Sequence, residues 1–521
     1  MSPKGVNSWS HAIATLIHPR AIVMLFLGFS AGLPILLIFS TLSVWLRDAG
    51  VDRSTVTFFS WAALGYSFKF VWAPIIDRMP FPGLSVRMGR RRSWLLVSQV
   101  CIIAAMLWIS FFDPQKALLM TAVGAMLVGF SSATQDIVID AYRIESADAD
   151  LQSMLSSMYI AGYRIGMLLA GAGSLWLADW WGPQGYDPNV WARVYRVMAL
   201  AMLVGVVTTV IIKEPLVEKR TESSFKGISD YIRFLVAFLI AITSFVLGFF
   251  WTAAPARVVK ALLVDNWGWI QQLAGFTTET LRFGMSVLMG GVAAWICIQT
   301  HLVPLGHIKE TYVDPIADFF RRYGKTALAI LLLVGTYRIS DILMGVIANL
   351  FYLDVGYTKS QIATYTKFWG LWATLGGGFL GGILSVRYGV GRILLLGAFL
   401  AAVTNLLFAY VAGQNPNEFL LLWVIVADNG SAGIAAAAFV AYLSSLTSVS
   451  FTAMQYALFS SIMTLFPKIL AGYSGSMVNS VGYTWFFIAT AIVGIPVLFL
   501  IVWTQRLQRG IDGPHRMSSK Q

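Results

Sequence analysis

The stretch WLRDAGVDRSTV (45–56) recurs in the second half of the chain as FYLDVGYTKSQI (351–362). An acid, a glycine and a serine fall at matching places in the two copies: Asp48 with Asp354, Gly50 with Gly356, and Ser54 with Ser360. About one helix later a second pattern follows, made of Asp77, Arg78, Gly89, Arg90, Arg91 and Arg92, with a weaker echo in Gly382, Arg387, Gly389 and Arg392. The recurrence indicates an internally duplicated fold.

The composition indicates a membrane protein. Hydrophobic residues make up 57% of the chain, charged residues only 12%, and the mean hydropathy is +0.71, which excludes an ordinary soluble globule. A helix needs about 20 apolar residues to cross roughly 30 Å of hydrocarbon. Fourteen such segments are predicted, near 21–46, 55–76, 94–112, 117–140, 154–178, 194–212, 231–254, 283–303, 326–350, 360–386, 390–412, 419–443, 452–473 and 482–504. The first is too long for a signal-peptide core, so we expect it to be retained.

The basic residues predict the orientation. If the N-terminus is cytoplasmic, the inside loops collect most of the lysines and arginines, such as Arg90 to Arg92, Lys219, Arg220, Arg321 and Arg322. This is the positive-inside pattern, so both termini are expected in the cytoplasm. The net charge of +12 is then an orientation signal and an attraction to anionic membrane lipids, and no soluble basic face is left for nucleic acid. Cys101 and Cys297 both fall in apolar segments, so no disulfide framework is expected.

An acid, a glycine turn and a basic cluster between the second and third helices form the loop signature of the major facilitator superfamily, which this chain resembles. The resemblance implies an all-α membrane protein of two six-helix halves. Two of the fourteen segments are then left over, in the middle of the chain. We therefore expect an N-terminal half at 1–212, a central linker with two extra transmembrane helices at 213–325, and a C-terminal half with a cytoplasmic tail at 326–521. An amphipathic stretch at 257–272 should lie outside, and the insert should be a spacer or pack against lipid.

Two carboxylates interrupt the end of an apolar segment in SSATQDIVIDAYR (131–143). Asp136 and Asp140 are four residues apart, so a helix places them on one face. An ionised side chain at membrane depth costs about 2.5–3.5 kcal/mol and usually marks an ion or substrate path. The alternative is a pair of acids at the aqueous end of the helix. We expect Asp136 or Asp140 to carry a coupled proton, with Asp341 and Asp428 next in line, because no histidine lies at membrane depth.

Further polar residues interrupt the apolar segments in both halves and are candidates for a central substrate cavity. They are Lys69, Gln135, Tyr163, Arg164, Arg338, Lys367, Asn429 and Gln455. Lysine, arginine and amide side chains suit an acidic solute rich in hydroxyl groups, whereas a purely structural ion pair is the alternative for each charge. The loop residues Asp77, Arg78, Gly89, Arg90 and Arg91 are expected to gate the cytoplasmic side by pairing with basic groups or a helix N-terminus. Gly28–Gly32, Gly162–Gly166 and Gly378–Gly382 are typical of close helix packing.

Several stretches resemble one family within the superfamily, the AmpG-type muropeptide permeases of Gram-negative bacteria. They are LGFSAGLP (27–34), YSFKFVWAPIIDR (66–78), GRRRSWLL (89–96), SSATQDIVIDAYR, GYRIGMLLAGAGSLWLAD (162–179), ADNGSAGIAAAAFVAYL (427–443) and FTAMQYALFSS (451–461). The resemblance implies proton-driven import of N-acetylglucosaminyl-1,6-anhydro-N-acetylmuramyl peptides from periplasm to cytoplasm, for cell-wall recycling and, where the circuit exists, β-lactamase induction.

Two alternatives stay open: a related carrier of acyl-coenzyme A or another anionic conjugate, and a non-transporting membrane receptor or scaffold. The second would leave the buried opposite charges unexplained. No catalytic triad, metal cluster or phosphate-binding glycine loop is evident in the sequence, so we expect no enzyme, no cofactor and no metal. We expect a monomer in the bacterial inner membrane, with the substrate, protons and lipids as partners.

Overall fold

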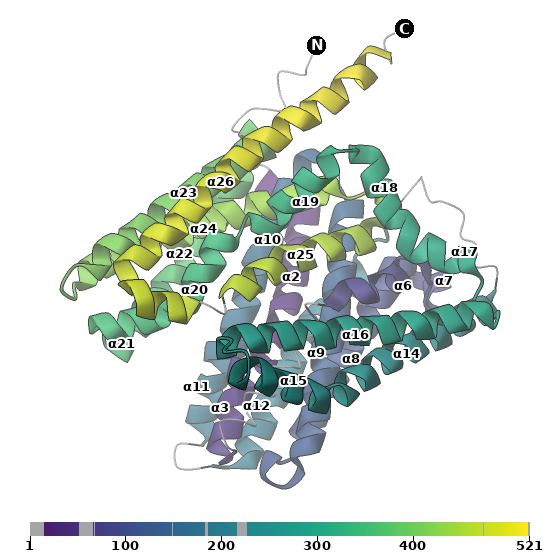
Figure 1. Cartoon of the computed structure of the whole chain (residues 1–521), viewed down its shortest axis with the longest axis horizontal. Helices are drawn as coiled ribbons and strands as arrows, with labels where there is room; N and C mark the ends of the chain where they lie inside the picture. Colours follow the sequence, from purple (N-terminus) through teal and green to yellow (C-terminus); the bar gives the residue numbers. More distant parts are fainter. Residues whose placement is uncertain are drawn as a thin grey trace. The chain divides into compact units, whose positions relative to one another are not determined.

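The computed structural model describes residues 15–51, 66, 68–147, 149–182, 186–215, 227–471 and 474–518. All regular structure in these ranges is helical (Figure 1). The chain forms two compact units, one of residues 1–220 with 318–521 and one of residues 221–317. The predicted all-α architecture is therefore confirmed for the described residues.

The larger unit contains helices of both predicted halves. Its first half consists of η1 (Thr15–Ile17), α2 (Pro19–Ile38), α3 (Ser40–Asp48), η3 (Lys69–Val71), α6 (Ala73–Arg78), α7 (Leu84–Met88), α8 (Arg90–Ser110), α9 (Pro114–Glu145), α10 (Ala149–Leu168), η4 (Leu169–Gly173), α11 (Ser174–Trp181), α12 (Pro188–Ala201) and α13 (Leu203–Ile211). Its second half consists of α19 (Thr326–Thr336), α20 (Ile339–Val355), α21 (Lys359–Ile362), η6 (Ala363–Trp369), α22 (Gly370–Tyr388), α23 (Val390–Ala412), α24 (Glu418–Leu446), η7 (Val449–Phe451), α25 (Thr452–Ala471) and α26 (Ser474–Ser518), preceded by α18 (Asp314–Tyr323).

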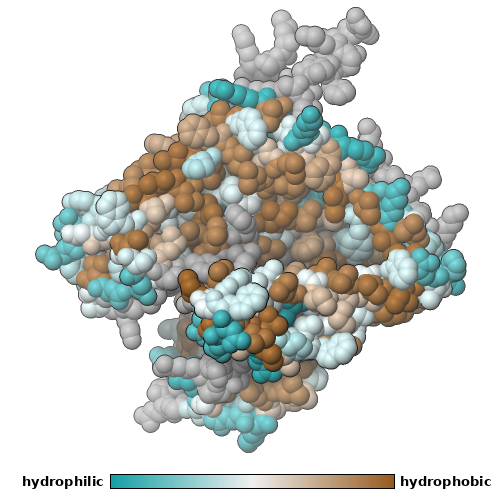
Figure 2. Space-filling model, viewed as in Figure 1, coloured by the Kyte–Doolittle hydropathy of each residue, from teal (hydrophilic) through white to brown (hydrophobic). Residues whose placement is uncertain are grey.

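Twelve helices within the described residues are long and apolar enough to cross a membrane. They match twelve of the fourteen predicted segments. The predicted segment 55–76 lies largely outside the described residues. The segment 452–473 corresponds to α25, and the apolar helical stretch there, Val449–Leu465 of η7 and α25, is shorter than the other twelve. Large hydrophobic side chains remain exposed along these helices, and Figure 2 shows hydrophobic residues over much of the visible surface with hydrophilic ones gathered toward its edges. Such a surface suits contact with lipid.

The duplication is visible in the backbone. Gly50 and Gly356, which the repeat aligns, both have positive φ angles, of 78° and 108°. Gly89 and Gly389 also match, with φ angles of 84° and 91° before α8 and α23. Only glycine adopts this conformation at little cost, so the turns need glycine at these places in both halves. The glycines of the repeat therefore reflect a shared backbone geometry.

Glycines also let helices approach at backbone distance within each half. A Cβ atom on Gly162 of α10 would lie 1.9 Å from the Leu25 carbonyl oxygen of α2, and one on Gly32 would lie 2.0 Å from that of Tyr163. In the second half the contact of α22 with α24 uses Gly377, whose Cβ would lie 2.0 Å from the Gly430 oxygen. Of the two glycines predicted to pack closely here, Gly378 faces open space. Gly382 instead approaches Ser157 of α10.

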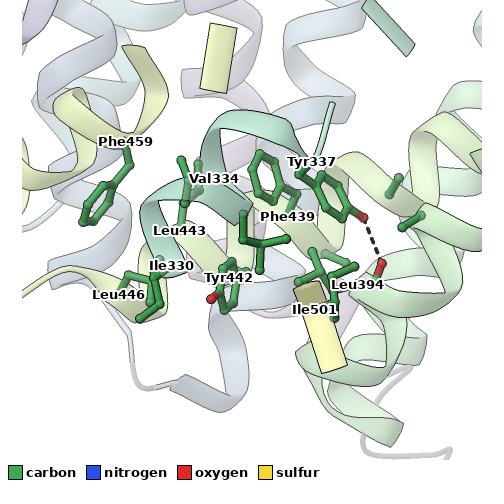
Figure 3. Close-up of a cluster of buried hydrophobic side chains, with 14 of the residues drawn as sticks. Ile330, Val334, Tyr337, Leu394, Phe439, Tyr442, Leu443, Leu446, Phe459 and Ile501 are labelled. Atoms are coloured by element: carbon green, nitrogen blue, oxygen red, sulfur yellow. Dashed lines mark hydrogen bonds between the residues drawn. The ribbon is translucent and has the colours of Figure 1, made fainter. Parts of the chain in front are cut away.

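Apolar side chains fill the interior of each half. In the second half Tyr337 stacks on Phe439 with ring centroids 4.2 Å apart, and its hydroxyl donates a hydrogen bond of 3.0 Å to the Leu394 carbonyl (Figure 3). In the first half Trp45 stacks on Trp191 with ring centroids 5.9 Å apart. The polar groups described below are therefore held by tightly packed surroundings.

The smaller unit consists of α14 (Ile228–Trp251), α15 (Ala253–Asp265), α16 (Gln271–Gln299), α17 (Leu305–Ile308), η5 (Lys309–Val313) and the start of α18. α14 packs against α16. Between them, Arg282 pairs with Glu279 at 2.7 Å and lies 4.2 Å over the Phe249 ring. α14 and α16 are the two extra apolar helices that the sequence predicts, and α15 overlaps the stretch 257–272 that is predicted to be amphipathic.

Candidate functional site

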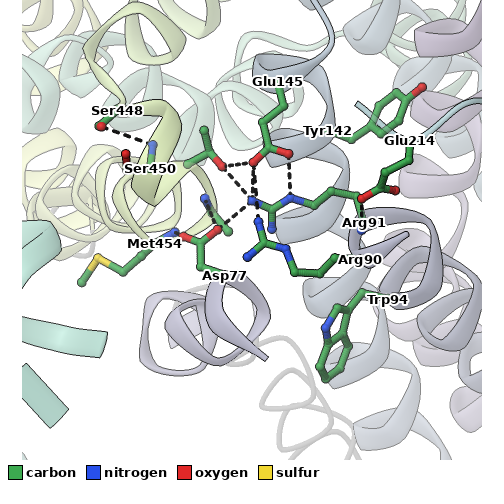
Figure 4. A network of polar contacts seen from close by, with 12 residues as sticks. Asp77, Arg90, Arg91, Trp94, Tyr142, Glu145, Glu214, Ser448, Ser450 and Met454 are labelled. Atoms are coloured by element: carbon green, nitrogen blue, oxygen red, sulfur yellow. Dashed lines mark hydrogen bonds and ion pairs between the residues drawn. The ribbon is translucent and has the colours of Figure 1, made fainter. Parts of the chain in front are cut away.

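Asp77, at the end of α6, binds the start of α25 from the other half of the chain (Figure 4). Its carboxylate accepts hydrogen bonds from the backbone N–H groups of Ala453 at 3.1 Å and Met454 at 2.8 Å. It also accepts one from Arg91 Nη2 at 2.7 Å, and its side chain is only 4% exposed. A carboxylate at a helix N-terminus satisfies free N–H groups and interacts favourably with the helix dipole. The contact therefore ties the two halves together.

Arg91 extends this contact across both halves. Its Nε donates to Glu145 Oε2 at 3.0 Å, and its Nη2 donates to Thr452 Oγ1 at 2.8 Å. The Thr452 hydroxyl in turn donates to Glu145 Oε1 at 2.6 Å. The side chains of Arg91 and Glu145 are fully buried. A buried charge is tolerated when it is paired and hydrogen-bonded, so this cluster depends on the two halves being in contact.

The remaining residues predicted to gate lie around this cluster. Arg90 Nη2 is 3.9 Å from Glu145, and the Arg78 guanidinium lies 5.0 Å over the Phe451 ring. Gly89 lies against the Glu214 side chain, which accepts hydrogen bonds from the backbone N–H groups of Arg91 and Arg92 at 2.8 and 3.0 Å. Glu214, just after α13, therefore caps the N-terminus of α8 in the first half.

α25 also packs on α9, and α10 packs on α22 and α24. These contacts between the halves lie at one end of the helix bundle, where α6, α9 and α24 end and α8, α10 and α25 begin. We call this the Asp77 end.

A second polar cluster lies on α9, one to two turns before the Asp77 end. Asp140 is shared by two cations, since Lys69 Nζ lies 3.5 Å from its Oδ2 and Arg143 Nη2 lies 3.1 Å from its Oδ1. Lys69 and Asp140 are 7% and 5% exposed, and Arg143 is fully buried. The structure thus brings together the predicted Lys69 and Asp140, and adds Arg143.

Asp136 and Gln135 lie one turn earlier on α9 and are also buried. Asp136 interacts electrostatically with Lys69 and Asp140, but its Oδ1 has no hydrogen-bond partner in the described part of the chain. Neither the oxygen nor the nitrogen of the Gln135 amide has one. Buried polar atoms nearly always find partners, and leaving one unpaired costs about 1–3 kcal/mol. These atoms are therefore available to a ligand or to protons.

A third group of charges includes residues of both halves. Arg164 of α10 interacts electrostatically with Arg338, which lies at the break between α19 and α20. Among the described residues neither arginine forms an ion pair within 4.0 Å. Two nearby like charges repel, so an anion between them would be favoured. Tyr163 stands beside Arg164 and its ring centroid lies 6.0 Å from that of Tyr159.

In the second half, Asp341 interacts electrostatically with Arg338 and with Asp428. Asp428 accepts a hydrogen bond of 3.2 Å from the Thr404 hydroxyl. The two acids that ranked behind Asp136 and Asp140 therefore interact with each other in the second half, and Asp341 also interacts with Arg338.

The other predicted substrate residues have different surroundings. Asn429 accepts from Thr374 at 3.2 Å and donates to the Ile425 carbonyl at 3.0 Å, so its amide joins α22 to α24. Gln455 accepts from Arg322 at 2.9 Å and from the Ser448 N–H at 2.7 Å, and donates to Asp318 at 3.1 Å. Both amides are thus bound within the protein. Lys367 lies in η6, and its side chain lies outside the described part of the structure.

Sequence reasoning missed Arg143, Glu145, Glu214 and Thr452. Arg143 and Glu145 end an apolar helix, where charges are ordinary, and Thr452 carries no signal of its own. No group of three histidine, cysteine, aspartate or glutamate side chains in the described ranges could hold a metal ion.

Comparison with known proteins agrees with this architecture. The model of the Major Facilitator Superfamily matches residues 21–307, more than half of the chain, and the chain belongs to this family. It is a multi-pass membrane protein whose relatives and fold are those of transporters rather than enzymes.

Among the relatives is a Rickettsia conorii protein named transporter AmpG 4, which is 31% identical over 93% of this chain and 96% of its own length. Another is the anhydromuropeptide permease of Escherichia coli, 26% identical over 93% of this chain and 79% of its own. These relatives confirm the resemblance to AmpG-type permeases that the sequence motifs suggest.

Solved structures show the same fold. The E. coli fucose:proton symporter FucP superimposes with a TM-score of 0.62 over 94% of this chain and 99% of its own, at 10% identity. The proton:xylose symporter XylE superimposes with a TM-score of 0.57 over 95% of this chain and 96% of its own, at 12% identity.

Proposed function

We propose that this protein is a proton-driven importer of anhydromuropeptides, which it carries from the periplasm to the cytoplasm for cell-wall recycling. The observation that supports this substrate most directly is the similarity over 93% of the chain to the E. coli anhydromuropeptide permease. The chemistry of the buried side chains is consistent with it, since such a substrate carries carboxylates, sugar hydroxyls and amides.

Two groups of side chains suit different parts of that substrate. Arg164 and Arg338, which interact electrostatically and form no ion pair among the described residues, would bind a carboxylate of the peptide. Gln135, buried with both amide atoms unpartnered in the described chain, would bind a sugar hydroxyl or an amide. Tyr163 and Lys69 lie beside these groups, Tyr163 next to Arg164 and Lys69 near Asp136. Lys367, Asn429 and Gln455 remain candidates on sequence grounds alone.

Asp136 is the preferred proton carrier and Asp140 the second choice. Asp140 is already bound by two cations within 3.5 Å, whereas Asp136 has a carboxylate oxygen with no partner in the described residues. A neutral Asp136 would let the carrier reorient without a bare buried charge. One proton moving through the full membrane potential supplies about 2.3 kcal/mol per 100 mV, or about fifty-fold accumulation. Asp341 and Asp428 in the second half are the next candidates for the proton carrier.

The remaining features complete the proposal. The Asp77 end is the cytoplasmic gate, and both termini lie in the cytoplasm of a monomer in the inner membrane. The chain spans the membrane fourteen times, with domains at 1–212, 213–325 and 326–521, and α14 and α16 as the two extra spans.

Uptake of a labelled anhydromuropeptide into proteoliposomes tests the function. A pH gradient, acidic outside, should drive accumulation, and a proton ionophore should abolish it. Uptake that reaches only equilibrium with the gradient present would contradict proton coupling. The absence of any specific uptake by folded protein would contradict the substrate.

A further inference from the structure

Arg143, in the last turns of α9, is a fully buried cation that belongs to neither the gate nor the substrate groups described above. Its guanidinium touches both halves of the chain. Nη1 donates to the hydroxyl of Ser156 on α10 at 2.8 Å and to that of Ser444 on α24 at 2.7 Å. The same nitrogen therefore bonds one serine in its own half and one in the other.

The two serines are closely matched. Ser156 is fully buried and Ser444 is 3% exposed. Each hydroxyl donates to the carbonyl four residues earlier in its own helix, Gln152 or Val440, at 2.8 Å, and each thereby presents its oxygen to Arg143. The essential difference between them is that only the Ser444 bond joins the halves.

The third contact of Arg143 is with a group that can change its charge. Nη2 donates to Asp140 at 3.1 Å, and this bond fixes the plane of the guanidinium. Other charged or titratable groups face this pair from each neighbouring element: Lys69 from η3, Asp136 from α9, Tyr159 from α10 and Tyr456 from α25. Among these described groups, the positive charges of Lys69 and Arg143 are neutralised only when both Asp136 and Asp140 are ionised.

Loss of the charge on Asp140 would leave Arg143 without its charged partner, and a buried cation without a partner is costly. Without the bond from Nη2 to Asp140, the planar guanidinium of Arg143 can rotate. Its bonds from Nη1 to Ser156 and Ser444 depend on the orientation that it then loses. The bond to Ser444 would then weaken, and the two halves would separate more readily at the Asp77 end.

We propose that Arg143 is a positioning residue that transmits the charge state of Asp140 to the contact between the two halves. An ionised Asp140 holds Arg143 so that it bridges Ser156 and Ser444, and the Asp77 end stays closed. Protonation of Asp140, or transfer of a proton to it from Asp136, releases Arg143 and favours opening. The inference rests on the proposed proton coupling, but its test needs neither substrate nor transport.

Distances between the halves provide the test. Spin labels at Val86 of α7 and Val449 of η7, which are 90% and 49% exposed, would report opening in the purified full-length protein after replacement of Cys101 and Cys297. Ser444→Ala and Asp140→Asn should each raise the ratio of open to closed molecules about tenfold, as expected for loss of one charged hydrogen bond. The matched control Ser156→Ala should leave the ratio unchanged.

The double variant decides between coupling and a merely structural bond. If Arg143 transmits the charge of Asp140, adding Ser444→Ala to Asp140→Asn has no further effect, because the bond is already lost. Independent, multiplied effects would overturn the proposal, as would equal effects of Ser156→Ala and Ser444→Ala. Arg143→Lys, which keeps the charge but not the planar fork, should open the end as Asp140→Asn does. An Arg143→Lys protein that stays closed would also overturn it.

Discussion

Replacement of Asp77 by asparagine would remove the charge that joins α6 to the start of α25. The carboxylate accepts three hydrogen bonds, two from backbone N–H groups of α25 and one from Arg91, at 2.7 to 3.1 Å. Asparagine has a similar size but offers only one acceptor oxygen, and its amide nitrogen would face a donor. Arg91 keeps its bonds to Glu145, so no buried cation is left without a partner.

The size of the effect follows from these bonds. A hydrogen bond to a charged group contributes about 1.5–3 kcal/mol, so the loss of the charge and of one or two bonds should weaken closure by about 3 kcal/mol. Because about 1.4 kcal/mol corresponds to a factor of ten, the ratio of open to closed molecules should rise on the order of a hundredfold. Substrate turnover should slow more than substrate binding weakens, because the closed state becomes rare in the cycle.

The distance between labels at Val86 and Val449 would measure the shift, and initial uptake rates at several substrate concentrations would measure turnover. Glu214→Gln is the matched control, because Glu214 also caps a helix N-terminus with two backbone bonds, but the capped helix is α8 of the first half rather than a helix of the second half. It should lower thermal stability without opening the Asp77 end. An unchanged distance distribution in Asp77→Asn, or a change in affinity alone, would refute the gating role.

Three further predictions use the same preparation. Arg164→Ala should abolish uptake while the protein still purifies as a folded monomer, and normal transport by this variant would contradict the carboxylate site. Asp136→Asn should lose accumulation driven by a pH gradient but keep exchange of labelled for unlabelled substrate across the membrane; if Asp136→Asn still concentrates substrate, the proton is carried elsewhere. Gly162→Ala should lower the melting temperature, because its Cβ would meet the Leu25 oxygen at 1.9 Å and overpacking costs about 1–3 kcal/mol, whereas Gly378→Ala, which faces open space, should not.

Much of the fold could be predicted because the membrane restricts it. Apolar segments of sufficient length must be helical, since no water pairs with the backbone there. The repeat was also readable, because the positive φ angles at Gly50, Gly89, Gly356 and Gly389 leave glycine at matching places. The register of α22 was not readable: GGG at 376–378 and GG at 381–382 offer several small faces, and only the position of α24 selects Gly377 and Gly381.

The candidate site was predicted in part. Asp77, Asp136 and Asp140 are conspicuous because a carboxylate is unusual in apolar surroundings. Their partners are not conspicuous: Thr452 meets Arg91 from 361 residues away, and no local pattern distinguishes it from other threonines. Gln455 shows a different limit of the sequence. It interrupts an apolar segment as a cavity residue would, but its amide is bound to Asp318, Arg322 and Ser448.

The glycine contacts have a mechanical consequence. Between α2 and α10, and between α22 and α24, main chain meets main chain, with no side chain whose rotamers could change to let one helix slide past the other. The two helices of each pair must therefore move together as one rigid body, and each half contains one such pair. Only the contacts that join the halves, made by side chains such as Asp77 and Arg143, can be exchanged one at a time. We therefore expect the two rigid helix pairs to rotate relative to each other during a conformational cycle, while polar contacts between the halves break and form. The helix pairs themselves should not bend.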